Sequence, residues 1–296
     1  MPDPLHKAKK IRGRGKDYEL RFKTSQWAEN LLIEGLNDAE LLVVRLGLSA
    51  IGEKNIIEIQ DPSIKVPDLL IFARADLSEA DIAKLPRDLS LLPADILSSA
   101  EYVTLVGKAR AAIEVEFSPY KASQMAGRSW VIHTEEKMAK RLLKHAKPPT
   151  APNIWIKEED LSRLKKWERS FKVPIVVVHV FDEEAFAIPL EKIYEFDSAY
   201  TARDEEGKRK LQLGGGIFKK LQTYDRVDAQ GAREQKWVFV VSPATAWFAG
   251  KVQNVIVEAQ LDISASKKYI AHPIFKGGNF ELADDFVSQL LQLKLR

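Results

Sequence analysis

The stretch that decides the fold is 111–117, which reads Ala-Ala-Ile-Glu-Val-Glu-Phe. Its apolar side chains alternate with two carboxylates, and an alternation with a period of two predicts a β-strand. The odd-numbered side chains from Ile113 onward then project to one face, whereas Glu114 and Glu116 project to the other. Two carboxylates on one face of an apolar strand repel each other and lose hydration, so the pattern favours a cation beside them.

Further strands and helices are predicted on both sides of this stretch. The run 66–72 (VPDLLIF) and the run 175–181 (IVVVHVF) have the apolar, β-branched character of strands. The run 158–171 has the spacing of an amphipathic helix. This order predicts an α/β fold with a mixed central β-sheet flanked by helices.

The remaining helices and strands are predicted from segments whose apolar spacing is less regular. Apolar spacing predicts helices over 24–36 and 38–46, and the run 102–106 predicts a short strand. After about residue 200 the sequence changes to strands separated by polar and glycine-rich loops, ending in an amphipathic helix over 282–293, which predicts a C-terminal α+β extension. We therefore expect three parts: a basic N-terminal arm (1–23), a catalytic core (24–200), and a C-terminal region integrated with the core (201–296).

The composition excludes several classes of protein. The chain has 296 residues, of which 45% are hydrophobic and 29% charged, and this excludes a disordered, collagen-like or coiled-coil chain. It contains no cysteine, which excludes disulfides, thiolate nucleophiles and cysteine-ligated zinc. No apolar run approaches the ~18 residues of a membrane span, and no apolar segment follows the basic N-terminus as in a secretory signal. We expect no membrane association and a cytoplasmic location.

A third carboxylate, Asp68, lies near the start of the predicted strand at 66–72. Asp68 is unusual at the start of such an apolar run, as are the two glutamates of 111–117. If the three carboxylates meet at one edge of the sheet, they form an oxygen-ligand site for a hard cation such as Mg²⁺. A Mg²⁺ ion held in this way can bind a phosphate oxygen and activate water.

Two segments together resemble the PD-(D/E)xK nuclease superfamily. They are Val66-Pro67-Asp68-Leu69-Leu70 and Ile113-Glu114-Val115-Glu116-Phe117, followed by 118–122 (SPYKA), which also resembles type II restriction enzymes. The third position of the motif is usually Lys; here it is Glu116, so the chain resembles the E-x-E variant of BamHI-type restriction endonucleases. The resemblance covers about 24–181 and not the C-terminal third.

The resemblance implies a fold, an activity and a set of site residues. It implies a restriction-endonuclease-like core and a Mg²⁺-dependent type II restriction endonuclease that cuts double-stranded DNA at a specific, palindromic sequence as a homodimer. Asp68 and Glu114 would ligate Mg²⁺, and Glu116 would ligate the metal or orient the attacking water. Lys121 is a candidate for the missing positive charge, and Glu29 on the first helix for an additional metal ligand. The alternatives for these last two are an ordinary surface lysine and a solvated helix carboxylate.

Basic residues outside the motif are candidates for DNA contact. Arginine and glutamine side chains suit guanine and adenine edges, and the polar segment 219–236 is rich in Arg, Lys and Gln. It is therefore predicted to supply base contacts, with Arg226 and Arg233 foremost. The N-terminal arm is predicted either to lie along phosphates or to be a solvated terminus. The full set of predicted DNA-binding residues is Arg128, Lys219, Lys220, Arg226, Arg233, Lys236, Lys267 and Lys268. For each of them the alternative is an ordinary surface charge.

Two other functions remain open at this stage. One is a non-catalytic DNA-binding or assembly protein with the same fold, and the other is a repair or structure-specific nuclease. The histidines form no pattern of metal ligands, and His179 within the apolar run 175–181 is predicted to be a core histidine.

Overall fold

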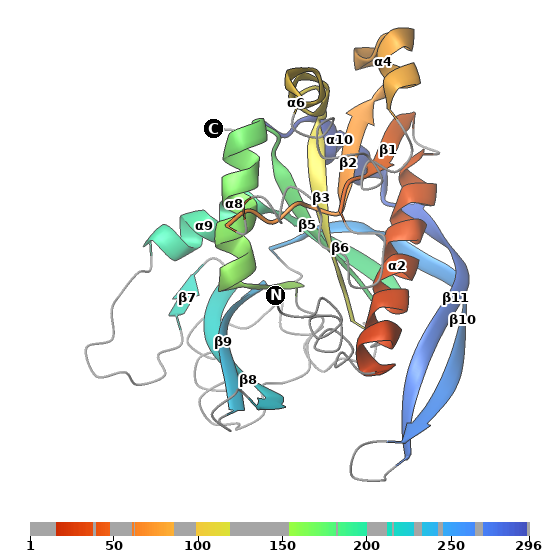
Figure 1. Ribbon diagram of the computed structural model, residues 1–296, viewed down its shortest axis with the longest axis vertical. Coiled ribbons are helices and arrows are strands. Elements are labelled where there is room, and N and C mark those ends of the chain that lie inside the picture. Colours follow the sequence, from red (N-terminus) through yellow and green to blue (C-terminus); the bar gives the residue numbers. More distant parts are fainter. Residues whose placement is uncertain are drawn as a thin grey trace, which may run out of the picture.

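A computed structural model describes the chain in twelve ranges. These ranges are 16–37, 40–47, 61, 63–85, 99–118, 154–181, 183–199, 212–214, 216–227, 233–241, 245–263 and 269–294. Within them, only the backbone is described for 16–24, 199, 212–214, 218, 220–227, 233–234, 259–263 and 269–273. The structure confirms an α/β fold with a large curled mixed sheet flanked by helices (Figure 1).

The main sheet has seven strands in the order β1-β2-β3-β5-β6-β10-β11. β3 and β5 run parallel, and every other neighbouring pair is antiparallel. The strands are β1 (Leu41–Arg45), β2 (Leu69–Ala73), β3 (Ala111–Phe117), β5 (Ile175–Val180), β6 (Glu184–Pro189), β10 (Trp247–Ile263) and β11 (Tyr269–Leu282). β3 is therefore an inner strand with hydrogen-bonded neighbours on both sides.

Both faces of this sheet are covered. On one face, helices α2 (Lys16–Asn37) and α10 (Asp284–Leu291) pack on the odd-numbered side chains of β3, such as Ile113. On the other face, helices α8 (Glu158–Phe171) and α9 (Leu190–Ala199) pack against the core that includes Ala112 and Val177. Figure 1 shows these two pairs of helices on opposite sides of the central strands. All six side chains of β5 are buried, as expected for a strand covered on both faces.

A second sheet packs on the same side of the main sheet as α8 and α9, and its residues join the same hydrophobic core. Its four antiparallel strands have the order β4-β9-β8-β7. They are β4 (Ile154–Lys157), β9 (Arg233–Val241), β8 (Ile217–Val227) and β7 (Gln212–Gly214). The C-terminal third thus contributes strands to both sheets, because β9 pairs with β4 and β10 pairs with β6.

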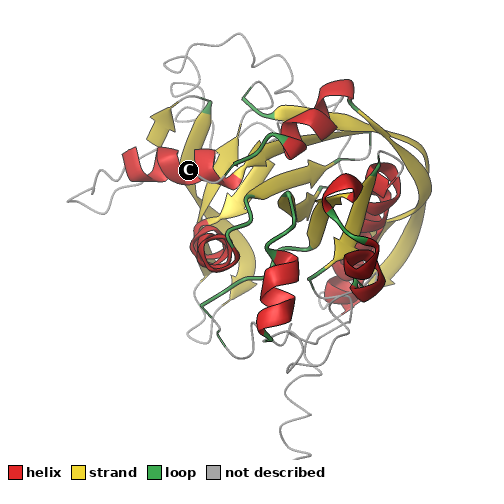
Figure 2. Ribbon diagram, turned by 90° about the horizontal axis from the view of Figure 1, so that it is seen from above, coloured by secondary structure: helices red, strands yellow, loops and turns green. Residues whose placement is uncertain are grey.

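The far end of the main sheet curls back over α2. Figure 2 shows the strands curving around the helices on this side. The indole N–H of Trp27 on α2 donates to the Gly277 carbonyl oxygen on β11 at 2.7 Å. The Trp27 ring also contacts Phe117 at the end of β3 and Phe275 on β11, with ring centroids 5.6 and 4.9 Å apart. This aromatic cluster joins the end of β3 to the curled hairpin.

Two of the predicted elements are wrong. The segment predicted as a helix over 38–46 forms strand β1, and the run predicted as a strand over 102–106 forms helix α6 (Ala100–Val106). A short apolar run fits either period, and pairing with β2 decides the first case. In the second, the Ser99 side chain accepts from the Tyr102 backbone N–H and so caps a helix.

Smaller elements complete the description. They are the 3₁₀-helix η1 (Arg74–Asp76) and helix α4 (Glu79–Lys84), both after β2. Helix α2 begins at Lys16, within the segment predicted as a basic arm. In the described part of the chain, none of the helices combines the length and apolar character required to cross a membrane.

The packing of β11 on α2 leads to a first prediction. A Cβ atom on Gly35 would lie 2.8 Å from the Phe280 carbonyl oxygen and 3.0 Å from its ring, so Gly35→Ala must push β11 away from α2. We expect it to lower the free energy of unfolding by about 1–3 kcal/mol, as overpacking does. Urea unfolding would measure this, with Glu34→Ala on the exposed side of the same helix as the control. If Gly35→Ala instead raised the free energy of unfolding by ~1 kcal/mol, as a glycine-to-alanine substitution does at an exposed helix position, the packing argument would be contradicted.

Candidate active site

Asp68 is held at the entrance to β2, directly beside β3. The Val115 backbone N–H donates to Asp68 Oδ2 at 2.7 Å, and the Leu46 and Gly47 N–H groups donate to the Asp68 carbonyl oxygen at 2.8 and 3.0 Å. A Cβ on Gly47 would lie 3.0 Å from both Cα and Oδ1 of Asp68, so only glycine leaves room for it there. The register pairs Leu69 with Ile113, which places Asp68 next to Glu114 across the two strands.

The carboxylates of β3 lie on the face covered by α8 rather than in open solvent. Glu114 is only 2% exposed, and Glu116 is half-buried. Burial raises the pKa of Glu114 to about 8 and that of Glu116 to about 7, and it also raises the pKa of Asp68 well above its usual range, where nearby Glu29 adds to the effect. Glu114 therefore does not lie on an exposed, solvated strand face.

Lys65 supplies a positive charge that the sequence analysis missed. Its ammonium contacts Glu114 Oε1 and lies 3.6 Å from Asp160 Oδ2 in the first turn of α8. Burial lowers the pKa of Lys65, but Glu114, Asp160 and, more weakly, Glu116 and Asp68 together hold it well above its usual value. Lys65 stands three residues before Asp68, and that proximity was the only signal in the sequence.

The segment that carries Lys65 is attached to α8. The Lys65 backbone N–H donates to the Arg163 carbonyl oxygen at 3.3 Å, and the Arg163 guanidinium donates to the Ile64 carbonyl oxygen at 2.9 Å. Asp160, which shares Lys65 with Glu114, also lies 3.9 Å from both Lys157 and Arg163. The expected source of positive charge, Lys121, lies outside the described residues.

The acidic side chains do not form a complete metal site as they stand. Over the ranges that the structure describes, no group of three or more His, Asp or Glu side chains has the arrangement of metal ligands. One oxygen is nevertheless unsatisfied: Glu114 Oε2 is buried and has no hydrogen-bond partner among the described residues. A buried carboxylate oxygen without a donor is a position that a hard cation can fill.

Glu29, on α2, is a further carboxylate close to Asp68. It is buried on α2, and Arg45 Nη2 on β1 lies 3.5 Å from Glu29 Oε2 while donating to Asn30 Oδ1 at 2.7 Å. Its negative charge is close enough to Asp68 to raise the pKa of Asp68. The alternative of a solvated helix carboxylate therefore does not apply to Glu29.

His179 lies beside the site, on the same face as Glu116. The register pairs these two residues across β3 and β5, and His179 Nε2 is 2.7 Å from the Ser118 hydroxyl. His179 is fully buried and stacks on Phe181, and burial lowers its pKa to about 3. It is a neutral core histidine, in accordance with the sequence analysis.

The predicted DNA-binding residues fall into four groups. The register pairs Val227 with Arg233, which places Arg226 and Arg233 near the tip of the β8–β9 hairpin. Lys219 is bound to Glu158 and Asp197 at 2.7 and 2.9 Å, and Lys236 contacts Glu159 at 2.5 Å. Only the backbone of Lys220 is described, within β8. The other candidates, Arg128, Lys267 and Lys268, lie outside the described residues, as does most of the N-terminal arm.

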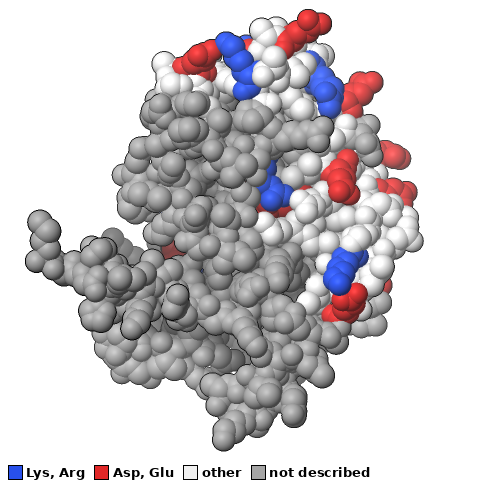
Figure 3. All heavy atoms as spheres, turned by 45° about the vertical axis from the view of Figure 1, so that its right-hand side comes forward, with Lys and Arg blue, Asp and Glu red and all other residues white. Residues whose placement is uncertain are grey.

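Charges of both signs are mixed on the described part of the face shown in Figure 3. In the view of Figure 3, lysine and arginine side chains on the described part alternate with acidic ones and do not gather into a basic patch. Lys219 and Lys236 fit this description, because each neutralises a carboxylate of α8 and so connects the second sheet to that helix.

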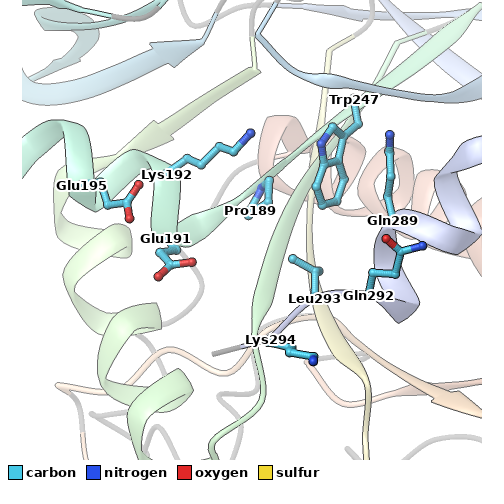
Figure 4. Close-up of a pocket in the computed structure, with 9 residues that line it drawn as sticks. All are labelled: Pro189, Glu191, Lys192, Glu195, Trp247, Gln289, Gln292, Leu293 and Lys294. Carbon is cyan, nitrogen blue, oxygen red and sulfur yellow. The ribbon is translucent and has the colours of Figure 1, made fainter. Parts of the chain in front are cut away.

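A surface hollow of about 580 Å³ lies elsewhere, between α9, α10 and the end of β6 (Figure 4). Trp247, Gln289, Gln292 and Lys192 are among the residues that line it. It adjoins Pro189, which pairs with Val176 near the start of β5, whereas Glu116 lies beside the other end of that strand. The hollow and the carboxylates are therefore separate features.

Comparisons with protein-family models, with curated proteins and with solved structures found no match to this chain. The chemistry of the site must therefore be argued from its own residues.

The buried carboxylates predict an unusual dependence of stability on pH. Their pKa values are raised in the folded state, so the stability they contribute is complete below the unfolded values near 4 and is lost as pH rises through about 7 and 8. Burial lowers the pKa of His179, so His179 makes stability rise with pH, but only below its unfolded pKa of about 6.5. Between about pH 6.5 and 8, without divalent cations, the free energy of unfolding should fall by at most ~1.4 kcal/mol per pH unit for each carboxyl group that keeps its proton, and this fall ends above the raised pKa values.

Chemical denaturation over this pH range would measure the slope. Glu116→Gln should flatten it, because glutamine does not titrate. The exposed Glu101, whose pKa Lys84 lowers, is the control: Glu101→Gln should leave the slope unchanged. A stability that is flat or rises over this range in the wild-type protein would contradict the assigned pKa directions.

Proposed function

We propose that this chain is a Mg²⁺-dependent DNA endonuclease, most specifically a type II restriction endonuclease acting on double-stranded DNA. The observation that carries the proposal is the convergence of Asp68, Glu114 and Lys65 at adjoining strands of a sheet buried on both faces, with Glu116 two residues further along β3. Buried carboxylates with raised pKa values are costly for stability, and such residues are concentrated at functional sites.

The carboxylates fit Mg²⁺ by their chemistry. Mg²⁺ prefers oxygen ligands, often one or two carboxylates together with water and substrate phosphate. Glu114 Oε2 lacks a partner among the described residues, and Asp68 and Glu116 are the acidic groups nearest to it in the sheet. Asp68 and Glu114 would hold the ion, with Glu116 or Glu29 as a further ligand. When bound, Mg²⁺ would polarise a phosphate oxygen and lower the pKa of water.

The protein's own groups have distinct roles in the proposed hydrolysis. The Val115 N–H fixes the Asp68 carboxylate, and the sheet fixes the direction of Glu114 and Glu116. Burial raises the pKa of Glu116 to about 7, which suits a general base that takes a proton from the attacking water near neutral pH. Lys65 supplies positive charge beside the phosphate, the role for which Lys121 was the candidate in the sequence.

The proposed specificity rests on the second sheet. The tip of the β8–β9 hairpin carries Arg226 and Arg233, and a two-stranded ribbon fits the major groove of DNA. A palindromic site would require two copies of the chain related by a two-fold axis, so the proposal includes a homodimer. A cytoplasmic location follows from the proposed DNA substrate.

The proposal predicts which substitutions stop cleavage. Asp68→Asn and Glu114→Gln keep the shape of the side chains and remove the charge that would hold the ion, so we expect cleavage to fall by at least ~10²-fold while DNA binding is kept. Mixed-sequence plasmid DNA digested with Mg²⁺ and resolved on a gel would measure cleavage, and a gel shift in Ca²⁺ would measure binding. Asp81 is a carboxylate outside the cluster, paired with Lys108; Asp81→Asn is the control and should cut as the wild type does.

The pattern of the wild-type digest separates the candidate functions. Discrete bands support the restriction endonuclease, and a smear indicates a nuclease without sequence preference. Binding without any cutting indicates a non-catalytic DNA-binding protein. Full activity in Asp68→Asn or Glu114→Gln would refute the assignment of these residues.

A further prediction concerns base recognition at the hairpin tip. An arginine that contacts guanine with two hydrogen bonds contributes about 1–3 kcal/mol of discrimination. Arg226→Ala or Arg233→Ala should therefore slow cleavage of the cognate site about 5- to 150-fold and change non-specific binding much less. Cleavage rates on cognate and single-mismatch duplexes would measure this. If both variants discriminate as the wild type does, recognition lies in another part of the chain.

A further inference from the structure

The Lys65 side chain lies within the cluster of carboxylates around Glu114. Its ammonium contacts Glu114 Oε1, and its charge interacts with Asp160, Glu116 and Asp68 as well. The side chain is only 22% exposed, so it lies within the cluster rather than above it. One ammonium group thus faces several carboxylates in the protein without a metal.

This single charge leaves the cluster incompletely balanced. Glu114 Oε1 has Lys65 as its partner, whereas Glu114 Oε2 is buried without a hydrogen-bond partner among the described residues. Glu114 is 2% exposed, so bulk water does not solvate it. A divalent cation could satisfy both oxygens, and it would then meet the Lys65 ammonium at the same carboxylate.

A second anion is available to Lys65 within the same region. Asp160 Oδ2 lies 3.6 Å from the Lys65 ammonium, on a helix to which the Lys65 backbone is hydrogen-bonded. The lysine side chain has four rotatable carbon–carbon bonds, so a small rotation moves its charge toward Asp160 and away from Glu114. The backbone anchor at Arg163 does not have to move.

We propose that Lys65 is a built-in counter-ion, which holds Glu114 in the cation-free protein and moves toward Asp160 when a divalent cation takes its place. The inference rests on the proposed function only in taking the carboxylates as a cation site. Lys65 then sets the concentration of cation at which the site fills, because each binding event must displace it. It acts here as a positioning residue.

Removal of the charge tests the competition directly. The probe is Mn²⁺ alone, titrated without DNA and followed by the electron paramagnetic resonance signal of the free ion. Lys65→Met keeps the length of the side chain and removes its charge, so the Mn²⁺ dissociation constant should fall by about tenfold or more, since close like charges oppose binding. Lys65→Arg should bind Mn²⁺ as weakly as the wild type or more weakly.

Two controls separate this effect from general electrostatics. Lys108→Met removes a lysine that is paired with Asp81 on the surface, and it should leave the Mn²⁺ dissociation constant unchanged within twofold. In the wild-type protein, nitrogen-15 spectra of the lysine ammonium groups should show one signal, absent in Lys65→Arg, that shifts as Mg²⁺ is added. This second measurement applies even if Lys65→Met does not fold.

The outcomes distinguish this inference from the proposed function. An unchanged or higher dissociation constant in a folded Lys65→Met protein, a Lys65 signal that ignores Mg²⁺, or no Mn²⁺ binding by either protein overturns the inference. If the wild type cleaves DNA but either of the first two results is found, the nuclease proposal is kept and the counter-ion role of Lys65 is rejected. Tighter Mn²⁺ binding in Lys65→Met without any wild-type cleavage supports the counter-ion and rejects the nuclease.

Discussion

Burial of β3 on both faces is the constraint on which the site depends. A strand whose side chains alternate must direct Glu114 and Glu116 to one face, and in this fold α8 and the second sheet cover that face. The charge therefore has to be balanced by groups that the protein itself provides, because water is largely excluded. Lys65 provides one positive charge. This charge does not offset the burial of all the carboxylates, and the pKa values of Glu114 and Glu116 are therefore raised.

The first turn of α8 carries acidic residues that pair with lysines from several elements. Its three consecutive acidic residues each have a lysine partner from another element: Lys219 of β8 for Glu158, Lys236 of β9 for Glu159, and Lys65 of the segment before β2 for Asp160. One helical turn thus connects the second sheet to the carboxylate cluster. For a nuclease that reads sequence with β8 and β9, this turn would be the shortest route between the hairpin and the site.

The sequence predicted the elements with a clear period and missed those defined by contacts. β3, β5 and α8 lie where the alternation and the helical spacing placed them, and the carboxylates of β3 lie on one face as expected. The segments 38–46 and 102–106 were assigned to the wrong class, since a short apolar run has no distinctive period. Lys219 and Lys236 were predicted to contact DNA, and only the structure shows that acidic partners on α8 hold them.

Lys65 was missed for a more general reason. The E-x-K pattern is a rule about neighbours in sequence, but the requirement behind it is a positive charge near a carboxylate in space. β2 and β3 are antiparallel, so the residues just before Asp68 run alongside the end of β3, although nearly fifty positions separate Lys65 from Glu114. A lysine on this neighbouring segment can reach the same carboxylate as a lysine at position 116 would. The positive charge beside Glu114 thus comes from the segment before β2 and not from position 116.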